Sequence, residues 1–227
     1  MSTFNSSVGN EKIEEVLKKA DTVVFFLGIG GVGMSALCEM LLSRGIAVVG
    51  SDRNLESDAV KRLIEKGVAV YPENSIPRGL SFDMLVYTLA IDANNPLFKV
   101  AREKGLPLVS RAELLGTLMR EYERRICVAG AHGKSTTTAI VDTLLFCGGY
   151  EPTTVSGAIL SSGSSFRLGG REYLVAEACE YKNSFLRFCP TAAIVTGIEL
   201  DHTDFFSDLG MIRRSFLDFL NWKFLEI

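Results

Sequence analysis

The chain has 227 residues, of which 47% are hydrophobic and 22% are charged, and its net charge is -3 at pH 7. This composition is typical of a folded globular protein, and the slight negative charge provides no basic surface for nucleic acid. No apolar run reaches the ~18 to 20 residues that span a bilayer, and the polar residues 1–10 do not have the pattern of a secretory signal. We therefore expect a cytoplasmic protein that binds neither nucleic acid nor a membrane.

Strand-like and helix-like segments alternate along the first half of the chain, which predicts an α/β fold with mostly parallel strands. An apolar strand at 23–27 is followed by a glycine-rich loop and a helix that ends near Gly45. Further strands are expected at 46–49, 68–71, 83–88 and 107–109, and further helices at 58–66, 96–104 and 111–122. We expect residues 1–22 to form an N-terminal arm with a short helix, and residues 23–123 to form a Rossmann-like parallel-sheet domain.

The second half starts again with a strand, a glycine loop and a helix, after the charged stretch 120–125. Strands are expected at 126–129, 153–156, 173–177 and 192–196, and helices at 134–146 and 209–220. Residues 124–227 are therefore expected to form a P-loop α/β domain. About a hundred residues is small for a nucleotide triphosphatase, so we expect this domain to be truncated.

The first loop, Gly28-Ile29-Gly30-Gly31-Val32-Gly33, matches the G-x-G-x-x-G dinucleotide fingerprint between a strand and a helix. Asp52 follows about 20 residues later, where the fingerprint places an acid that binds ribose. Loops of this kind present backbone amides and a helix N-terminus to an anion. The motif does not identify the nucleotide: NAD, a flavin or another diphosphate is compatible with it. The alternative to a binding site is a purely structural glycine turn that lets helix and strand pack closely.

The second loop, Gly130-Ala131-His132-Gly133-Lys134-Ser135, ends like a P-loop, although the first glycine of the general pattern would fall at Val128. Lys134 can reach the β- and γ-phosphates of a nucleotide triphosphate, and the Ser135 hydroxyl can bind Mg²⁺. Two such loops predict two phosphorylated ligands.

Acidic side chains and a histidine follow the later strands. Glu177 ends the strand at 173–177, and Asp201 and His202 come soon after the strand at 192–196. Ligands gather at the carboxyl ends of strands in open α/β sheets, and carboxylate, imidazole and hydroxyl groups suit Mg²⁺ or Mn²⁺. We expect Asp201 and Glu199 to orient His202. Each residue taken alone could equally be a solvated polar group at a strand end.

These motifs together resemble the Mur ligases of peptidoglycan synthesis. The resemblance runs in the same order along nearly the whole chain from residue 23, and it is carried by 27–35, 50–52, 88–91, 95–96, 110–113, 130–138, 176–180, 184–186 and 198–204. The sequence departs from the family at Ala131, where threonine is usual, and at Gly197, where asparagine is usual. The C-terminal amino-acid-binding domain of the family is absent, and its central domain normally continues past residue 227.

The resemblance implies the ligand and the role of each candidate residue. A UDP-sugar would lie on Gly30, Gly31, Val32, Gly33, Ser51 and Asp52. ATP would lie on Gly130, His132, Gly133, Lys134, Ser135 and Thr136. Magnesium or manganese would be bound by Ser135, Glu177 and His202, and the catalytic residues would be Lys134, Glu177 and His202.

The resemblance also implies a reaction. A carboxylate of UDP-N-acetylmuramate would attack the γ-phosphate of ATP, and the amine of L-alanine would capture the acyl phosphate. Two alternatives stay open: a recycling ligase that adds a tripeptide to the same sugar nucleotide, and a non-catalytic relative that binds a UDP-sugar. We expect this chain to be a fragment without turnover.

Overall fold

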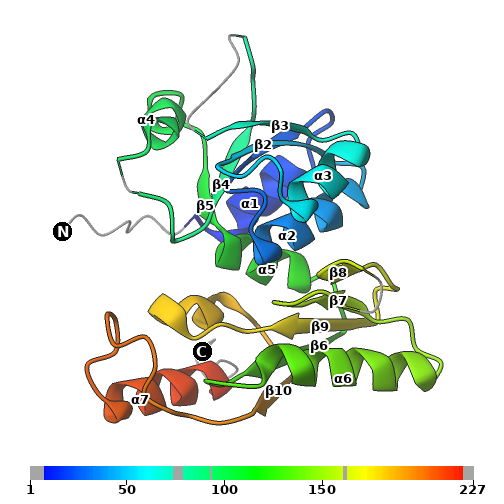
Figure 1. Cartoon of the computed structure of the whole chain (residues 1–227), viewed down its shortest axis with the longest axis vertical. Coiled ribbons are helices and arrows are strands. Elements are labelled where there is room, and N and C mark those ends of the chain that lie inside the picture. The colour runs from blue at the N-terminus through cyan, green and yellow to red at the C-terminus, as the bar shows by residue number, and fades with distance from the viewer. Residues whose placement is uncertain (1–7, 74–78, 93, 161–162, 222–227) are drawn as a thin grey trace. The chain divides into compact units, whose positions relative to one another are not determined.

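The computed structural model describes residues 8–73, 79–92, 94–160 and 163–221. The chain divides into two compact units, Met1–Thr117 and Leu118–Ile227. Each unit is built on a five-stranded sheet with helices (Figure 1), and the predicted α/β fold is confirmed. Residues 1–7 of the expected N-terminal arm lie outside the described residues. Within the described parts of the chain, no helix is long and apolar enough to cross a membrane.

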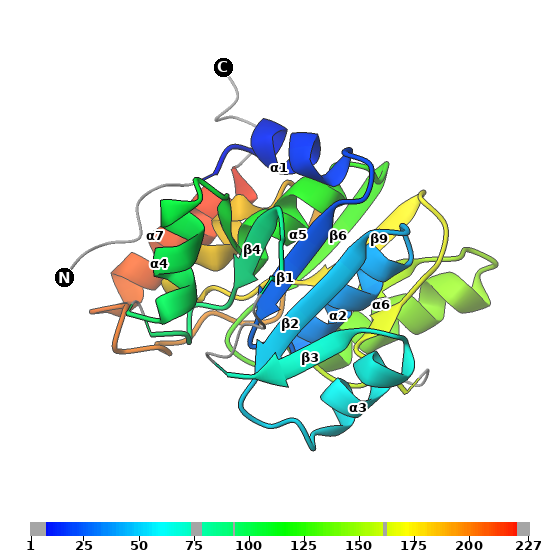
Figure 2. The same cartoon turned by 90° about the horizontal axis from the view of Figure 1, so that it is seen from above.

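The first unit has the alternating strands and helices that the sequence predicts. Its elements are α1 (Asn10–Leu17), β1 (Val23–Leu27), α2 (Val32–Leu42), β2 (Ala47–Asp52), α3 (Asp58–Glu65), β3 (Ala69–Pro72), β4 (Met84–Tyr87), α4 (Pro96–Glu103), β5 (Leu108–Ser110) and α5 (Arg111–Met119). The strand order is β3-β2-β1-β4-β5, every pairing is parallel, and Figure 2 shows β3, β2 and β1 lying side by side. All five strands therefore end at the same edge of the sheet, where the first glycine loop lies.

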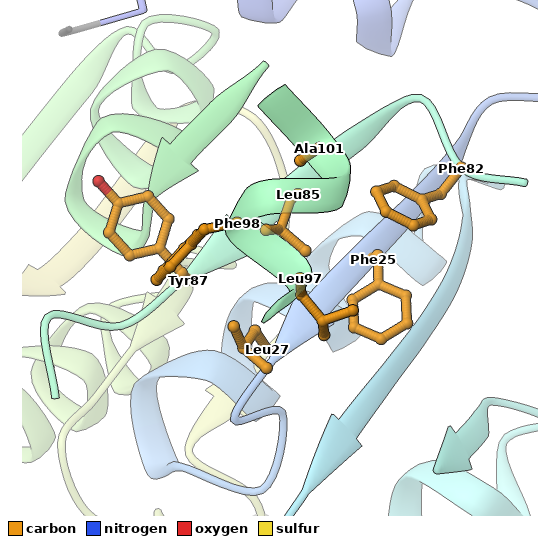
Figure 3. Close-up of a cluster of buried hydrophobic side chains, with 8 residues drawn as sticks. All are labelled: Phe25, Leu27, Phe82, Leu85, Tyr87, Leu97, Phe98 and Ala101. Atoms are coloured by element: carbon orange, nitrogen blue, oxygen red, sulfur yellow. The ribbon is translucent and has the colours of Figure 1, made fainter. Parts of the chain in front are cut away.

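One face of this sheet is covered by α4 (Figure 3). Successive residues of a strand point to opposite faces, so Phe25 and Leu27 of β1 share a face. They form a buried cluster with Leu85 and Tyr87 of β4 and with three residues of α4, which are Leu97, Phe98 and Ala101. The rings of Tyr87 and Phe98 meet edge to face with centroids 5.1 Å apart. This packing fixes β1 and β4, and hence the start of the loop that follows β1.

The second unit contains two elements that the sequence analysis did not predict, β8 and η1. Its elements are β6 (Arg124–Ala129), α6 (Lys134–Cys147), β7 (Thr153–Val155), β8 (Phe166–Arg167), β9 (Tyr173–Glu177), the 3-10 segment η1 (Tyr181–Arg187), β10 (Ala192–Val195) and α7 (Leu209–Leu220). The strand order is β10-β6-β9-β7-β8, and β7 and β8 pair antiparallel while the other pairs are parallel. Strand β6 begins at Arg124, inside the charged stretch that was expected to precede it.

A buried carboxylate ties α6 to the β7–β8 hairpin. The Asp142 side chain accepts a hydrogen bond of 2.6 Å from the Thr154 hydroxyl and one of 2.8 Å from Nη1 of Arg167. The Arg167 guanidinium also lies 4.0 Å from the ring centroid of Phe146 on α6. Asp142 is almost fully buried, so the two hydrogen bonds are needed to offset the cost of removing its charge from water.

We predict that Asp142→Ala destabilises the second unit. The change leaves Arg167 and Thr154 without their shared acceptor, and it should lower the free energy of unfolding by roughly 3 kcal/mol, the low end for a broken buried pair because Arg167 is partly exposed. Urea unfolding followed by circular dichroism measures this. The matched control is Thr143→Ala, since the Thr143 hydroxyl is exposed and bonds within α6. Equal unfolding curves for the two variants would contradict the prediction.

Candidate nucleotide-binding sites

The first loop is held in shape by β2. The amides of Gly28 and Ile29 donate to the carbonyl oxygen of Ser51 at 2.8 and 3.1 Å. The Asp52 carboxylate accepts from the amide of Gly30 at 2.7 Å and from the amide of Asn54 at 2.9 Å. Asp52 thus fixes the loop itself, which differs from the ribose-binding role that the fingerprint assigns to an acid at this position.

The predicted residues of the first loop lie together at the ends of β1 and β2. Gly28 has a φ of 80°, which favours glycine, and Gly31 caps α2 without a side-chain hydrogen bond. The first amides of a helix have no acceptor within the helix, so they can bind an anion. Ser51 is fully buried, and its hydroxyl has no hydrogen-bond partner among the described residues. A buried hydroxyl without a partner is costly, which suits a residue that hydrogen-bonds a ligand.

The second loop connects β6 to α6 and is shaped by two glycines. Gly130 has a φ of 135°, and a Cβ atom there would lie 2.2 Å from the hydroxyl oxygen of Thr196. Gly133 caps α6 in the left-handed conformation, with a φ of 79°. The amide of Ala131 donates to the carbonyl of Gly197 at 2.9 Å, which joins the loop to the segment after β10. A side chain at position 130 would therefore push Thr196 away from the loop.

Lys134 begins α6 and its side chain folds back over the loop. Its Nζ donates to the carbonyl of Gly130 at 2.6 Å and lies 3.2 Å from Oε2 of Glu180. The Glu180 side chain is 2% exposed and that of Lys134 is 15% exposed. A lysine ammonium is therefore held at the mouth of a glycine loop by a buried carboxylate. Glu180 was not among the predicted site residues.

Ser135 and Glu177 are in direct contact. The Ser135 hydroxyl donates to Oε2 of Glu177 at 2.8 Å, and the amide of Gly157 donates to the same oxygen at 2.8 Å. A Cβ atom at Gly157 would lie 2.6 Å from both carboxylate oxygens, so glycine is required at this close approach. A hydroxyl and a carboxylate at the N-terminus of a P-loop helix match the ligands that Mg²⁺ prefers.

A second group of ligand atoms comes from the ends of β9 and β10. One ligand atom from each of Glu180, Asp201 and His202 lies within 4.8 Å of the others, a spacing that could hold a metal ion. The amide of His202 donates to Oδ1 of Asp201 at 2.7 Å, and this bond holds the pKa of Asp201 below its usual value. Two carboxylates and an imidazole suit Mg²⁺ or Mn²⁺.

The remaining predicted residues lie at the exposed side of the loop. His132 is largely exposed and its Nε2 is 3.8 Å from the Glu199 carboxylate, so Glu199 faces His132 and does not orient His202 as expected. Thr136 is exposed on the first turn of α6. Through Glu180, the structure links Lys134 to His202, and the neighbouring Ser135 contacts Glu177.

Tyr181 is a second residue that the sequence analysis missed. Its ring lies against the His202 imidazole with centroids 4.6 Å apart and an angle of 39° between the rings. Its hydroxyl donates to Asp204 at 2.7 Å. Tyr181 directly follows Glu180, so the rule that ligands gather at the carboxyl ends of strands could have identified both residues after β9.

The chain is similar in sequence and in structure to known ligases. Residues 23–123 match a family described as "Mur ligase family, catalytic domain". A UDP-N-acetylmuramate–L-alanine ligase from Lachnospira eligens is 47% identical over 195 residues, which are 85% of this chain and 42% of that protein. The structure of the UDP-N-acetylmuramate–alanine ligase from Thermotoga maritima superposes with a TM-score of 0.80 at 30% identity, over 86% of this chain and 46% of the other.

A third match is the UDP-N-acetylmuramate:L-alanyl-γ-D-glutamyl-meso-diaminopimelate ligase from Neisseria meningitides. Its TM-score is 0.81 at 25% identity, over 89% of this chain and 68% of that one.

The chain is thus similar to Mur ligases over most of its length.

The sequence likeness to the Lachnospira eligens ligase extends past the first unit, because the alignment covers 85% of this chain. A region of that length must include the second loop, Glu177 and Glu180. The chain spans less than half the length of the Lachnospira eligens and Thermotoga maritima ligases.

We predict that Asp204 controls the ionisation of Tyr181. The hydrogen bond to the Asp204 carboxylate raises the pKa of Tyr181 because it favours the neutral phenol. The stabilisation is present below the usual pKa of tyrosine and is lost as the pH rises through the raised value. In Asp204→Ala, one tyrosine should therefore titrate at lower pH, followed by the ultraviolet absorbance of tyrosinate. Asp218→Asn on α7 is the control. An unchanged titration in Asp204→Ala would show that Tyr181 does not make this bond.

Proposed function

We propose that this chain forms the two nucleotide-binding sites of an ATP-dependent ligase that joins L-alanine to UDP-N-acetylmuramate. The observation that carries the proposal is the arrangement around the second loop: Glu180 links Lys134 to Asp201 and His202, and Ser135, next to Lys134 in the chain, contacts Glu177. A lysine beside two sets of oxygen-rich metal ligands is suited to a triphosphate and its cations. The names of the relatives support the choice of substrates.

We assign UDP-N-acetylmuramate to residues 23–123. Its diphosphate would lie along the loop at Gly30, Gly31, Val32 and Gly33, at the N-terminus of α2, and the buried Ser51 hydroxyl would hydrogen-bond the nucleotide. Asp52 would support the loop, because its carboxylate is already bonded to two backbone amides. This use of Asp52 argues against NAD, which requires an acid that is available to a ribose.

We assign ATP to residues 124–227, on the loop formed by Gly130, His132, Gly133, Lys134, Ser135 and Thr136. Ser135 and Glu177 would bind one Mg²⁺ or Mn²⁺, and His202 with Glu180 and Asp201 would bind a second. The cations would neutralise charge on the phosphoryl group as it is transferred. Lys134 would contact the phosphates, and the packing of Tyr181 against His202 would keep that imidazole in one orientation.

The comparisons favour L-alanine as the added group. The relative that adds L-alanine is 47% identical, whereas the ligase that acts on the tripeptide is 25% identical. The recycling ligase is therefore the second candidate.

The first test compares nucleotides at the first loop. Isothermal titration calorimetry of this chain should show binding of UDP-N-acetylmuramate and no binding of NAD, because Asp52 is occupied within the loop. Gly30→Ala is a second variant for the same measurement. Its new methyl group would lie 2.9 Å from Oδ2 of Asp52, so it should disturb the loop and weaken binding of the sugar nucleotide. Tighter binding of NAD than of UDP-N-acetylmuramate would refute the assignment.

The second test concerns Lys134. Lys134→Ala should weaken binding of ATP with Mg²⁺ by about ten- to a hundredfold for each charge-assisted contact that is lost. The change also leaves Glu180 buried without its cation, so it should lower stability as well. The double variant Lys134→Ala/Glu180→Gln removes that unpaired charge, and we expect it to recover stability but not ATP affinity. Arg213→Ala, on the exposed side of α7, is the control for loss of a positive charge. ATP affinity equal to that of the wild type in Lys134→Ala would contradict the assignment.

A further inference from the structure

Arg111 begins α5 at the same edge of the sheet as the first glycine loop. A reciprocal pair of hydrogen bonds fixes this helix start: the amide of Ser110 donates to the Glu113 carboxylate at 2.8 Å, and the amide of Glu113 donates to the Ser110 hydroxyl at 3.2 Å. This is a capping box, which satisfies amides that would otherwise have no acceptor. The backbone of Arg111 is therefore held in one place, immediately after β5.

The side chain of Arg111 crosses to the loop and lies over Gly33. A Cβ atom at Gly33 would be 3.0 Å from Nη1 and 3.1 Å from Cδ of Arg111. In the dinucleotide fingerprint, the third glycine is explained by close packing of helix and strand. In this chain, the absent side chain of Gly33 instead leaves room for an arginine.

This placement puts a cation beside two other features that suit an anionic ligand. The amides of the first turn of α2 and the positive end of its dipole face the loop. The buried Ser51 hydroxyl, without a partner among the described residues, lies at the end of the neighbouring strand β2. An anion on the loop would lie beside the helix N-terminus and the Arg111 guanidinium together.

We propose that Arg111 binds the diphosphate of the uridine nucleotide on the first loop, and that Gly33 is required to admit its guanidinium. The inference rests on the proposed function, which places a UDP-sugar at this loop. A guanidinium offers several N–H donors in one plane, so it can bind oxygens of a phosphate in a bidentate manner while the loop amides bind others.

The test is titration of the whole chain with UDP. The wild type should bind UDP, and Arg111→Ala should bind it about ten- to a hundredfold more weakly, as expected for loss of a charge-assisted contact. Arg111→Lys should be intermediate, since it keeps the charge and loses the planar geometry. Gly33→Ala should also weaken binding, because the added methyl group displaces the guanidinium. Lys18→Ala is the matched control: Lys18 is exposed and precedes the start of β1, whereas the loop follows its end.

The outcomes separate the two proposals. If the wild type binds UDP and Arg111→Ala binds it within twofold of the wild type, Arg111 is not a diphosphate ligand and the inference is overturned while the proposed function stands. If the wild type does not bind UDP, the UDP-sugar assignment fails and the inference fails with it. Unchanged thermal unfolding of Arg111→Ala, measured beside Lys18→Ala, establishes that a weaker affinity reflects lost contact and not lost folding.

Discussion

Parallel strand pairing determines where the polar residues of each unit meet. Because the strands of the first sheet all run in the same direction, β1, β2 and β5 end at one edge, and Gly30, Asp52 and Arg111 come together although they are far apart in the sequence. The second sheet does the same for the ends of β6, β9 and β10, which bring Lys134, Glu180 and His202 together. The buried apolar strands therefore place the polar residues that follow them.

The sequence was sufficient to predict the parts of the fold that local patterns control. The apolar run at 23–27, the glycines after it and the helical spacing beyond predict β1, the first loop and α2, because each element can be recognised within its own segment. The two-residue strand β8 could not be found this way. It is short, antiparallel and held by the contact of Arg167 with Asp142 on α6, and no local pattern reports a contact between segments so far apart.

The same limit explains which site residues were missed. Glu177 ends β9 and Glu180 lies three residues later, and the two look alike in the sequence. In the structure, Glu177 contacts Ser135 and Glu180 contacts Lys134. The difference arises in the backbone after β9, where the chain leaves the sheet and turns through η1. The packing of Tyr181 on His202 depends on two different strand ends and on the same turn. The types of residue at the strand ends were enough to predict where the site lies. The partner of each carboxylate depends on the path of the chain after β9, which the sequence does not reveal.

Glu180 has an unusual position because it is buried and touches both halves of the second site. A buried ion pair seldom stabilises a fold more than apolar residues of the same size would, so the Lys134–Glu180 pair is weakly explained by stability. It is better explained by position. Phosphate oxygens that approach Lys134 would share its ammonium with Glu180, so Glu180 would lose part of its positive partner. A cation beside Asp201 and His202 would supply positive charge to Glu180 in its place. Binding of the nucleotide and binding of the metal would each make the other more favourable.

Three residues around this site have an unusual backbone conformation. Among the described residues, Asp21, Lys182, Asn183 and His202 are the non-glycine residues with a φ between 50° and 58°, and the last three lie in the two loops that carry Tyr181 and Asp201. A left-handed conformation costs about 1 kcal/mol or more for such residues, so it persists where the surroundings hold it. Here the Ser215 hydroxyl of α7 donates to Asn183, and the Asp201 carboxylate holds the amide of His202. A fold that needed these loops merely as connections could use glycine at each position without strain. Glycine could not replace two of these side chains in their contacts, because the Asn183 amide oxygen accepts from Ser215 and the His202 imidazole lies beside Glu180, Asp201 and Tyr181.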